Sequence, residues 1–213
     1  IVWLSNMSHN NNKISFFNDS TFGIANNINA LRKYSKIVTK NYVRSSSEKV
    51  SLFQESGFLT FQNKYAKLIA SVGGIISKEQ PGHSHGDNLS FELSLLGKRL
   101  IVNSGISTYS YNEDRILQRS AISHNTLTYK NYNSNDIWSS FRVGKKANVY
   151  EDQLMISKNR DCLVASYYHD GFKSIFTNII HKREWDINKK YLKVTDFINN
   201  KKNTSIVRYY FHP

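Results

Sequence analysis

The sequence predicts a mainly β protein, an antiparallel β-sandwich preceded by a short helical N-terminal segment. Near the start, apolar residues recur at three- and four-residue steps, whereas after Lys49 the apolar period falls to two. Short apolar runs then follow one another closely, separated by turn-forming residues, which is typical of antiparallel sandwiches. With 213 residues and 13% aromatic content, the chain is long enough to fill a core.

The helical stripe covers residues 22–38, and Asp19 or Ser20 would cap its N-terminus. Residues 41–47 are mostly polar and show no periodic pattern. We therefore place a domain boundary between residues 45 and 46.

Strand patterns begin after this boundary. In residues 89–95, apolar side chains alternate with serine and glutamate, and Gly97-Lys98 would join this strand to residues 99–102 through a type II′ hairpin. Six further strands are predicted at residues 65–72, 126–129, 162–168, 175–185, 191–198 and 205–212. The last three of these would form a meander.

The charge balance is strongly basic. Lys and Arg number 29 against 16 Asp and Glu, a net charge of +13, which suits a nucleic acid, an anionic membrane surface or an acidic polysaccharide. A general Lys- and Asn-rich residue usage would give the same balance. The basic residues are scattered and no nucleic-acid-binding motif occurs, so we expect no nucleic-acid partner.

Two kinds of structure are excluded by composition. The longest apolar stretch, residues 65–76, contains Lys67 and is too short to span a membrane. The single cysteine, Cys162, rules out an internal disulfide framework and reads as a small apolar strand residue.

Chemistry-bearing residues are densest in residues 81–87 (PGHSHGD). In an extended segment, His83, His85 and Asp87 would point the same way. Two imidazoles on one face could bind a metal, or one could bind it while the other meets substrate. The two flanking glycines would let backbone or ligand approach closely.

Two further segments converge on this loop. Asn103 ends the strand that the hairpin pairs with residues 89–95, so it should emerge at the same end of the sheet as the histidines. His124 stands at the start of another predicted strand. Taken alone, Asn103 could be a turn residue and His124 a core-edge residue bonded to backbone. Their convergence on the histidine loop favours a functional site. The remaining histidines read as loop, turn or strand residues: His9, His169, His181 and His212.

Taken together, these motifs resemble the heparinase II/III-like domain of polysaccharide lyases. The likeness runs in order through residues 82–93, 102–105, 108–109, 119–120, 124–126, 138, 141–143, 169–171, 181–185 and 211–213. That family pairs an N-terminal (α/α) toroid with a C-terminal antiparallel β-sandwich of the super-sandwich type. The resemblance implies that residues 1–45 are the helical tail of the toroid and residues 46–213 the sandwich, truncated at its C-terminus.

The resemblance also implies an activity. The family cleaves acidic, uronate-containing glycans by β-elimination, so the chain would belong to a carbon–oxygen lyase of the periplasm or the cell exterior. His83 matches the histidine that neutralises the sugar carboxylate, and Arg119 and Tyr109 would contact substrate. The base and the acid come largely from the toroid, so this chain alone should be inactive.

A zinc ion is implied as well, held by His85, Asn103 and His124. The family often carries Asp where this chain has Asn103, and an amide oxygen is a poorer zinc ligand than a carboxylate. Zinc would then bind weakly, be replaced by another ion or be absent. Asp87 would orient an imidazole or simply cap its loop.

Two other functions stay open. One is a non-catalytic carbohydrate-binding or cell-surface glycan assembly protein with the same fold, which the residue at position 103 favours. The other is a cupin-like metal oxygenase that uses His83, His85 and His124 together with Glu92.

Overall fold

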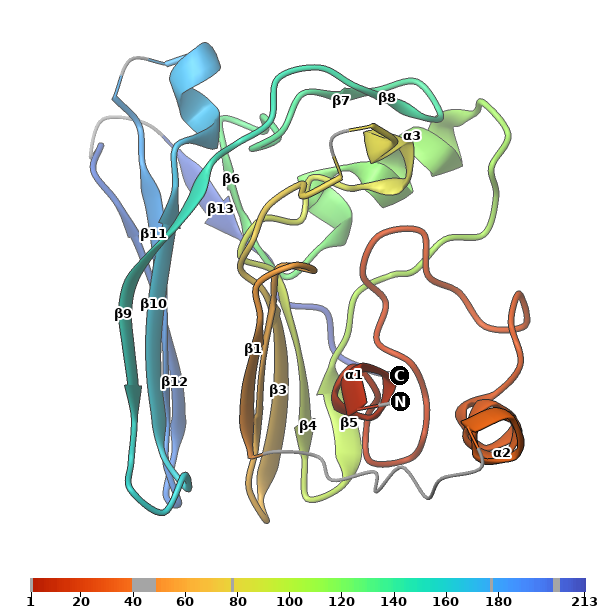
Figure 1. The fold of residues 1–213 in the computed structure, drawn as a ribbon. Helices are drawn as coiled ribbons and strands as arrows, with labels where there is room; N and C mark the ends of the chain where they lie inside the picture. Colours follow the sequence, from red (N-terminus) through yellow and green to blue (C-terminus); the bar gives the residue numbers. More distant parts are fainter. Residues whose placement is uncertain (1, 40–48, 78, 177, 201–203) are drawn as a thin grey trace.

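Two antiparallel sheets pack face to face (Figure 1). The computed structural model describes residues 2–39, 49–77, 79–176, 178–200 and 204–213. One sheet has five strands in the order β1-β2-β3-β4-β5, and the other has four in the order β12-β11-β10-β9. The predicted mainly β sandwich is therefore confirmed, whereas the predicted boundary between residues 45 and 46 lies outside the described residues.

The elements have the following bounds. The five-stranded sheet contains β1 (Val50–Phe53), β2 (Phe58–Gln62), β3 (Ala66–Ser71), β4 (Phe91–Leu95) and β5 (Lys98–Ile101). The four-stranded sheet contains β9 (Val149–Ile156), β10 (Leu163–His169), β11 (His181–Ile187) and β12 (Leu192–Ile198). Two small sheets pair β6 (Leu127–Tyr129) with β13 (Ser205–Val207) and β7 (Ile137–Trp138) with β8 (Arg142–Val143). The α-helices are α1 (Val2–Asn6), α2 (Ile28–Thr39) and α3 (Glu113–Arg119).

The core lies between the two large sheets. Leu68 and Phe91 from one sheet and Trp185 from the other are fully buried, and the rings of Phe91 and Trp185 meet edge to face at 6.2 Å. Strand alternation explains this, because every second residue of β11 is buried. Each large apolar side chain removed from water contributes about 2 kcal/mol.

A buried polar cluster fastens the N-terminal segment to the five-stranded sheet. The carboxylate of Glu92 in β4 accepts hydrogen bonds from Nε2 of His9 at 2.6 Å, from the amide of Phe16 at 2.8 Å and from the amide of Asn103 at 3.0 Å. His9 lies in a loop, as expected, but it is only 2% exposed and its side chain holds Glu92, so it has a structural role that the sequence did not indicate. These contacts fix the path of the residues that follow, including Asp19.

The helix and the hairpin differ locally from the sequence prediction. Helix α2 begins at Ile28, because the side chain of Asn27 caps it by accepting a hydrogen bond from the amide of Ala30 at 3.0 Å. The hairpin between β4 and β5 turns at Leu96-Gly97 rather than at Gly97-Lys98. Both turn residues have positive φ, which makes it a type I′ turn instead of type II′.

Several strands were also misjudged. Strand β11 begins at His181 rather than at residue 175, because the chain continues from the 3₁₀ turn Gly171–Ser174 into turn and irregular backbone at residues 175–176 and 178–180. Strand β13 pairs with β6 and does not continue the meander, which β9, β10, β11 and β12 form instead. Strand β9 escaped prediction because it is a largely exposed edge strand with acidic residues where a core strand would be apolar.

No helix in the described part of the chain has the length and apolar character needed to cross a membrane.

Candidate functional site

The chemistry-bearing loops meet above one end of the five-stranded sheet (Figure 1). The segment after β3 carries a 3₁₀ turn, Pro81–His83, and the segment after β5 leads into α3. Between them and the N-terminal segment lies a cleft of about 580 Å³, whose lining includes Asp19, His83, Asp87 and Tyr109. The structure thus brings the predicted histidine loop to the rim of the sheet.

Asp19 is the centre of this site. One carboxylate oxygen accepts hydrogen bonds from Nδ1 of His83 at 2.7 Å and from Arg115 at 2.8 Å. The other accepts from Nε2 of His85 at 2.9 Å and again from Arg115. A single carboxylate therefore joins both histidines of the His-x-His motif to helix α3.

The environment of Asp19 keeps it ionised. Its side chain is only 5% exposed, and this burial opposes ionisation, yet the hydrogen bonds from His85, Arg115 and His83 outweigh it. The pKa of Asp19 therefore lies well below its usual value. The fully buried Arg115 guanidinium compensates the charge.

His83 is the imidazole that solvent reaches, with 57% of its side chain exposed. Its ring lies edge-on to Tyr109 at 5.9 Å and to Phe141 at 5.5 Å. The guanidinium of Arg115 lies 5.1 and 5.0 Å from the centres of the same two rings. His83 is thus anchored through Nδ1 and framed by aromatic rings, which leaves Nε2 for the cleft.

His85 and His124 form a buried pair beneath His83. Nδ1 of His85 lies 3.1 Å from Nε2 of His124, within hydrogen-bond distance. Burial, and then the neighbouring His85, lower the pKa of His124 well below its usual value, so His124 is neutral at physiological pH. Both nitrogens of His85 are engaged, one by His124 and one by Asp19.

Asn103 is also buried, and its side-chain oxygen already has partners. It accepts from Oγ of Ser90 at 2.9 Å and from both the amide and the side chain of Asn125 at 3.2 Å. Because those Asn125 groups are donors, they hold the oxygen of Asn103 toward themselves. Its Nδ2 is left buried without an acceptor.

This donor set is incomplete for zinc. In the described part of the chain, no three His, Cys, Asp or Glu side chains cluster as a metal site requires. His85 and His124 supply imidazole nitrogens, whereas the side-chain oxygen of Asn103, its one possible metal-binding atom, already accepts hydrogen bonds from Ser90 and Asn125. We therefore assign no chemical step to a metal.

Asp87 and Arg119 support the loop. Asp87 interacts with the backbone amide of Asn18, and burial raises the pKa of its carboxyl.

Arg119 is fully buried, and its guanidinium donates to the carbonyls of Ser84 at 3.0 Å and Ser139 at 3.0 Å. Burial, and then the nearby Arg115, lower the pKa of Arg119 to about 10. The predicted substrate contact of Arg119 stays a prediction, since in this structure the side chain binds protein backbone.

The flanking glycines permit close backbone packing. A Cβ atom on Gly82 would lie 2.8 Å from the carbonyl oxygen of Phe141, and one on Gly86 would lie 3.1 Å from the amide of Ala121. The distance at Gly82 is shorter than real Cβ contacts, so a side chain there would force the backbone of Phe141 to move, whereas at Gly86 a side chain would require its neighbours to shift only slightly.

Sequence reasoning missed two residues of this site. Asp19 reads as a helix cap, and nothing nearby in the sequence links it to His83. Arg115 left a usable signal, because it stands four residues before Arg119 in a helix that Asn112 caps. Residues at that spacing share a helix face, and both arginines are buried.

A second histidine pair lies outside the cleft. Nε2 of His169 is 3.1 Å from Nδ1 of His181, whose Nε2 donates to Asp196 at 2.6 Å. Arg183 also binds Asp196, and it donates to the carbonyls of Leu89 at 2.8 Å and Asn125. This network ties the four-stranded sheet to the loops that carry the site.

The fold and the cleft define a two-sheet sandwich domain of the type found in polysaccharide lyases. A sequence profile described as "Heparinase II/III-like, C-terminal" matches residues 46–213. The chain therefore belongs to the heparinase II/III-like family, as its motifs predicted. A search of the curated proteins finds no match to this chain.

Solved structures show the same fold. A heparinase III gene product aligns with a TM-score of 0.70 and 19% sequence identity, and the alignment covers 94% of this chain and 32% of that protein. A structure described as heparinase III aligns with a TM-score of 0.67 and 18% identity, covering 91% of this chain and 32% of that protein. The heparan sulfate lyase HepC from Pedobacter heparinus aligns with a TM-score of 0.65 and 21% identity, covering 90% of this chain and 30% of HepC. The chain thus spans about a third of the length of these proteins.

Proposed function

We propose that this chain is the sandwich part of a polysaccharide lyase that cleaves an acidic, uronate-containing glycan by β-elimination. The observation that carries the proposal is the pairing of a solvent-exposed His83 with a buried, ionised Asp19 at the mouth of the cleft. Family membership and the net charge of +13 agree with an acidic polysaccharide as the substrate.

β-Elimination needs a group that stabilises charge on the sugar carboxylate while the C5 proton leaves. A preorganised donor aimed at that charge lowers the barrier most effectively. The hydrogen bond to Asp19 fixes the ring of His83, so that in the imidazolium form, which carries a proton on each nitrogen, Nε2 can donate to the sugar carboxylate without reorganisation. The 47% exposure of Tyr109 and the 5.9 Å between its ring and that of His83 support the proposal that it contacts the same sugar.

The base and the acid would come from a helical domain that precedes the sandwich. The solved heparinases are about three times as long as this chain, which covers 30–32% of them. We place the protein in the periplasm or outside the cell, where its polysaccharide substrate would be met. No nucleic-acid partner is proposed.

The decisive test follows unsaturated products by their absorbance. Heparan sulfate, hyaluronan and alginate are offered to the 213-residue chain and to the longer protein that we propose contains it. We expect product only from the longer protein, on at least one of the three. Turnover by the chain alone would contradict the division of labour between the domains.

A second function keeps the same fold but not the reaction. A non-catalytic carbohydrate-binding or glycan assembly protein is favoured by one observation, the uncharged Asn103 at the position where the family resemblance implies a zinc ligand. Binding of uronate oligosaccharides without unsaturated products would support it.

Zinc itself stays a prediction, which elemental analysis of the purified protein tests. The oxygenase alternative lacks its carboxylate, because Glu92 is bound to His9 and to two backbone amides.

A further inference from the structure

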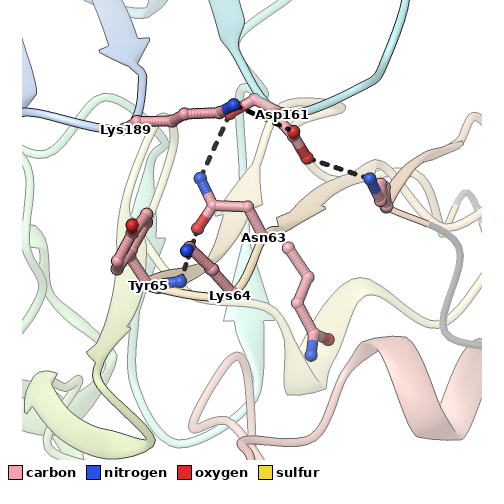
Figure 2. A pocket seen from close by; sticks show the side chains of 7 residues that line it. Asn63, Lys64, Tyr65, Asp161 and Lys189 are labelled. Atoms are coloured by element: carbon pink, nitrogen blue, oxygen red, sulfur yellow. Dashed lines mark hydrogen bonds and ion pairs between the residues drawn. The ribbon is translucent and has the colours of Figure 1, made fainter.

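A second hollow lies at the end of the sandwich opposite the histidine cleft, and Figure 2 shows its walls. Strand β3 begins at this hollow and ends at the loop that leads to His83. The hollow has a volume of about 460 Å³, within the range of small-molecule sites. Turns from both large sheets line it, so it exists only because the two sheets are packed together.

The charges in this hollow do not balance. Lys49, Lys64 and Lys189 line it, together with one carboxylate, that of Asp161. Nζ of Lys49 lies 2.9 Å from Asp161, and Nζ of Lys189 lies 3.6 Å from its other oxygen. Two ammonium charges are thus left over in a concave space. Like charges at such a site repel one another, and a bound anion would relieve the repulsion.

The walls of the hollow are held in place by hydrogen bonds. Oδ1 of Asn63 accepts from the amides of Tyr65 and Ala66, both at 2.8 Å, and its Nδ2 donates to the carbonyl of Asp161 at 3.1 Å (Figure 2). Lys49 donates to the carbonyl of Asn159 at 3.0 Å. Ligand binding would therefore cost little conformational entropy, because these turns are already ordered.

An aromatic wall adds a second kind of contact. Tyr65 is 36% exposed, and Nζ of Lys64 lies 4.7 Å from the centre of its ring. A sugar ring offers an apolar face of C–H groups next to its charged substituents. An exposed aromatic ring beside ammonium groups matches both features.

We propose that this hollow is a non-catalytic binding site for the carboxylate or sulfate groups of an acidic saccharide. The saccharide part of this assignment rests on the proposed function, whereas the anion part rests on the lysines alone. The site would hold a distant part of a glycan chain, away from the cleft.

The test compares two double variants of the full 213-residue chain. K64Q/K189Q removes two of the three lysines, one of which, Lys189, lies 3.6 Å from Asp161. It spares Lys49, which lies 2.9 Å from Asp161 and joins the two sheets. K130Q/K173Q is the matched control. Lys130 lies 4.9 Å from the ring centre of Phe176, and Lys173 lies 3.6 Å from Asp170, outside the hollow. Both variants lose the same charge.

Binding of a heparan sulfate octasaccharide is followed by the NMR shifts of backbone amides. In the wild-type chain we expect shifts at residues 62–66 and 188–190. K64Q/K189Q should weaken binding at these amides about fivefold, and K130Q/K173Q should change it less than twofold. Equal losses in both variants, or no loss in the first, would overturn the proposal.

The same spectra separate this proposal from the proposed function. The amides of residues 82–87 report binding in the histidine cleft. If the saccharide shifts the amides of the hollow but not those of the cleft, the result would count against the lyase assignment and not against the binding site proposed here. A sulfate-free polyguluronate octamer shows whether carboxylates suffice. If a DNA duplex shifts residues 62–66 at lower concentration than either saccharide, the saccharide assignment is wrong.

Discussion

Nδ1 of His83 lies 2.7 Å from a carboxylate oxygen of Asp19, although 64 positions separate the two residues in the sequence. This contact links the N-terminal segment to the loop above the five-stranded sheet. It divides the roles of two neighbouring histidines, because His83 faces the cleft while His85 is buried. The geometry of the site therefore depends on a residue from outside the two sheets.

Replacing the exposed imidazole should remove activity without affecting the fold. For His83→Ala in the longer protein, we expect the rate of unsaturated product formation to fall about 10²-fold or more, the loss typical when one charge-stabilising donor is removed. The free energy of unfolding of the 213-residue chain should fall by about 1 kcal/mol or less, because most of this side chain is exposed and Asp19 keeps its hydrogen bonds from His85 and Arg115. Urea denaturation and initial rates measure the two quantities.

The matched control for this prediction is His212→Ala, an exposed histidine near the end of the chain. It should leave both the rate and the stability unchanged. A fully active His83→Ala protein would show that another group neutralises the sugar carboxylate.

Asp19→Asn should weaken the fold in a pH-dependent way. The folded-state pKa of Asp19 lies below its value in the unfolded chain, so its stabilising effect is present above pH 4 and is lost as pH falls through the folded-state pKa. At pH 7 we expect the variant to lose about 2–3 kcal/mol, since Arg115 keeps its burial but loses an anionic partner. The difference from wild type should shrink below pH 4.

Asp152→Asn tests whether any lost carboxylate has this effect. Asp152 pairs with Lys182 at 2.7 Å, but both side chains are 37% exposed. Denaturation at pH 7 and pH 3 should show little change at either pH. A pH-independent loss in Asp19→Asn would mean that shape, rather than charge, explains its effect.

How far the sequence could anticipate this site depends on the range of the interactions. The alternation in β4 and the short turn before β5 were enough to place Asn103 at the same sheet end as His83. Local patterns could not place Asp19, because its position depends on the buried contact between Glu92 and His9, 83 residues apart. An acidic residue before a helical stripe also has a simpler explanation as a cap.

The same limit applies to the strands. Strand β11 was found because its inward residues are apolar or paired, whereas β9 has an exposed and partly acidic pattern that resembles a loop. Its place in the sheet follows from pairing with β10 across a bulge between Ser166 and Tyr167. Such pairing is a tertiary property, so an exposed edge strand such as β9 leaves little signal in the sequence.

Arg119→Gln should destabilise the chain rather than simply weaken substrate binding. The guanidinium donates to the carbonyls of Ser84 and Ser139, and the shorter amide would leave buried acceptors unpaired. We expect the free energy of unfolding to fall by about 2–4 kcal/mol. Arg142→Gln, at a nearby exposed arginine, is the control and should have little effect. A variant with normal stability but a raised KM in the longer protein would instead favour the predicted substrate contact.

Asn103→Asp should create the zinc site that the donor set lacks. Asn125 would hold one carboxylate oxygen, as it now holds the amide oxygen, and the second would replace the Nδ2 that has no acceptor. The zinc content, measured by elemental analysis, should then rise from less than one ion to about one ion per chain. Without zinc the variant should unfold at a lower temperature than wild type, because it buries an unpaired charge, and added zinc should restore its stability. The double variant Asn103→Asp/His124→Ala removes one imidazole and should gain no zinc. Stoichiometric zinc in the wild-type protein would refute this account, since Asn103 would then have to turn its oxygen away from Asn125.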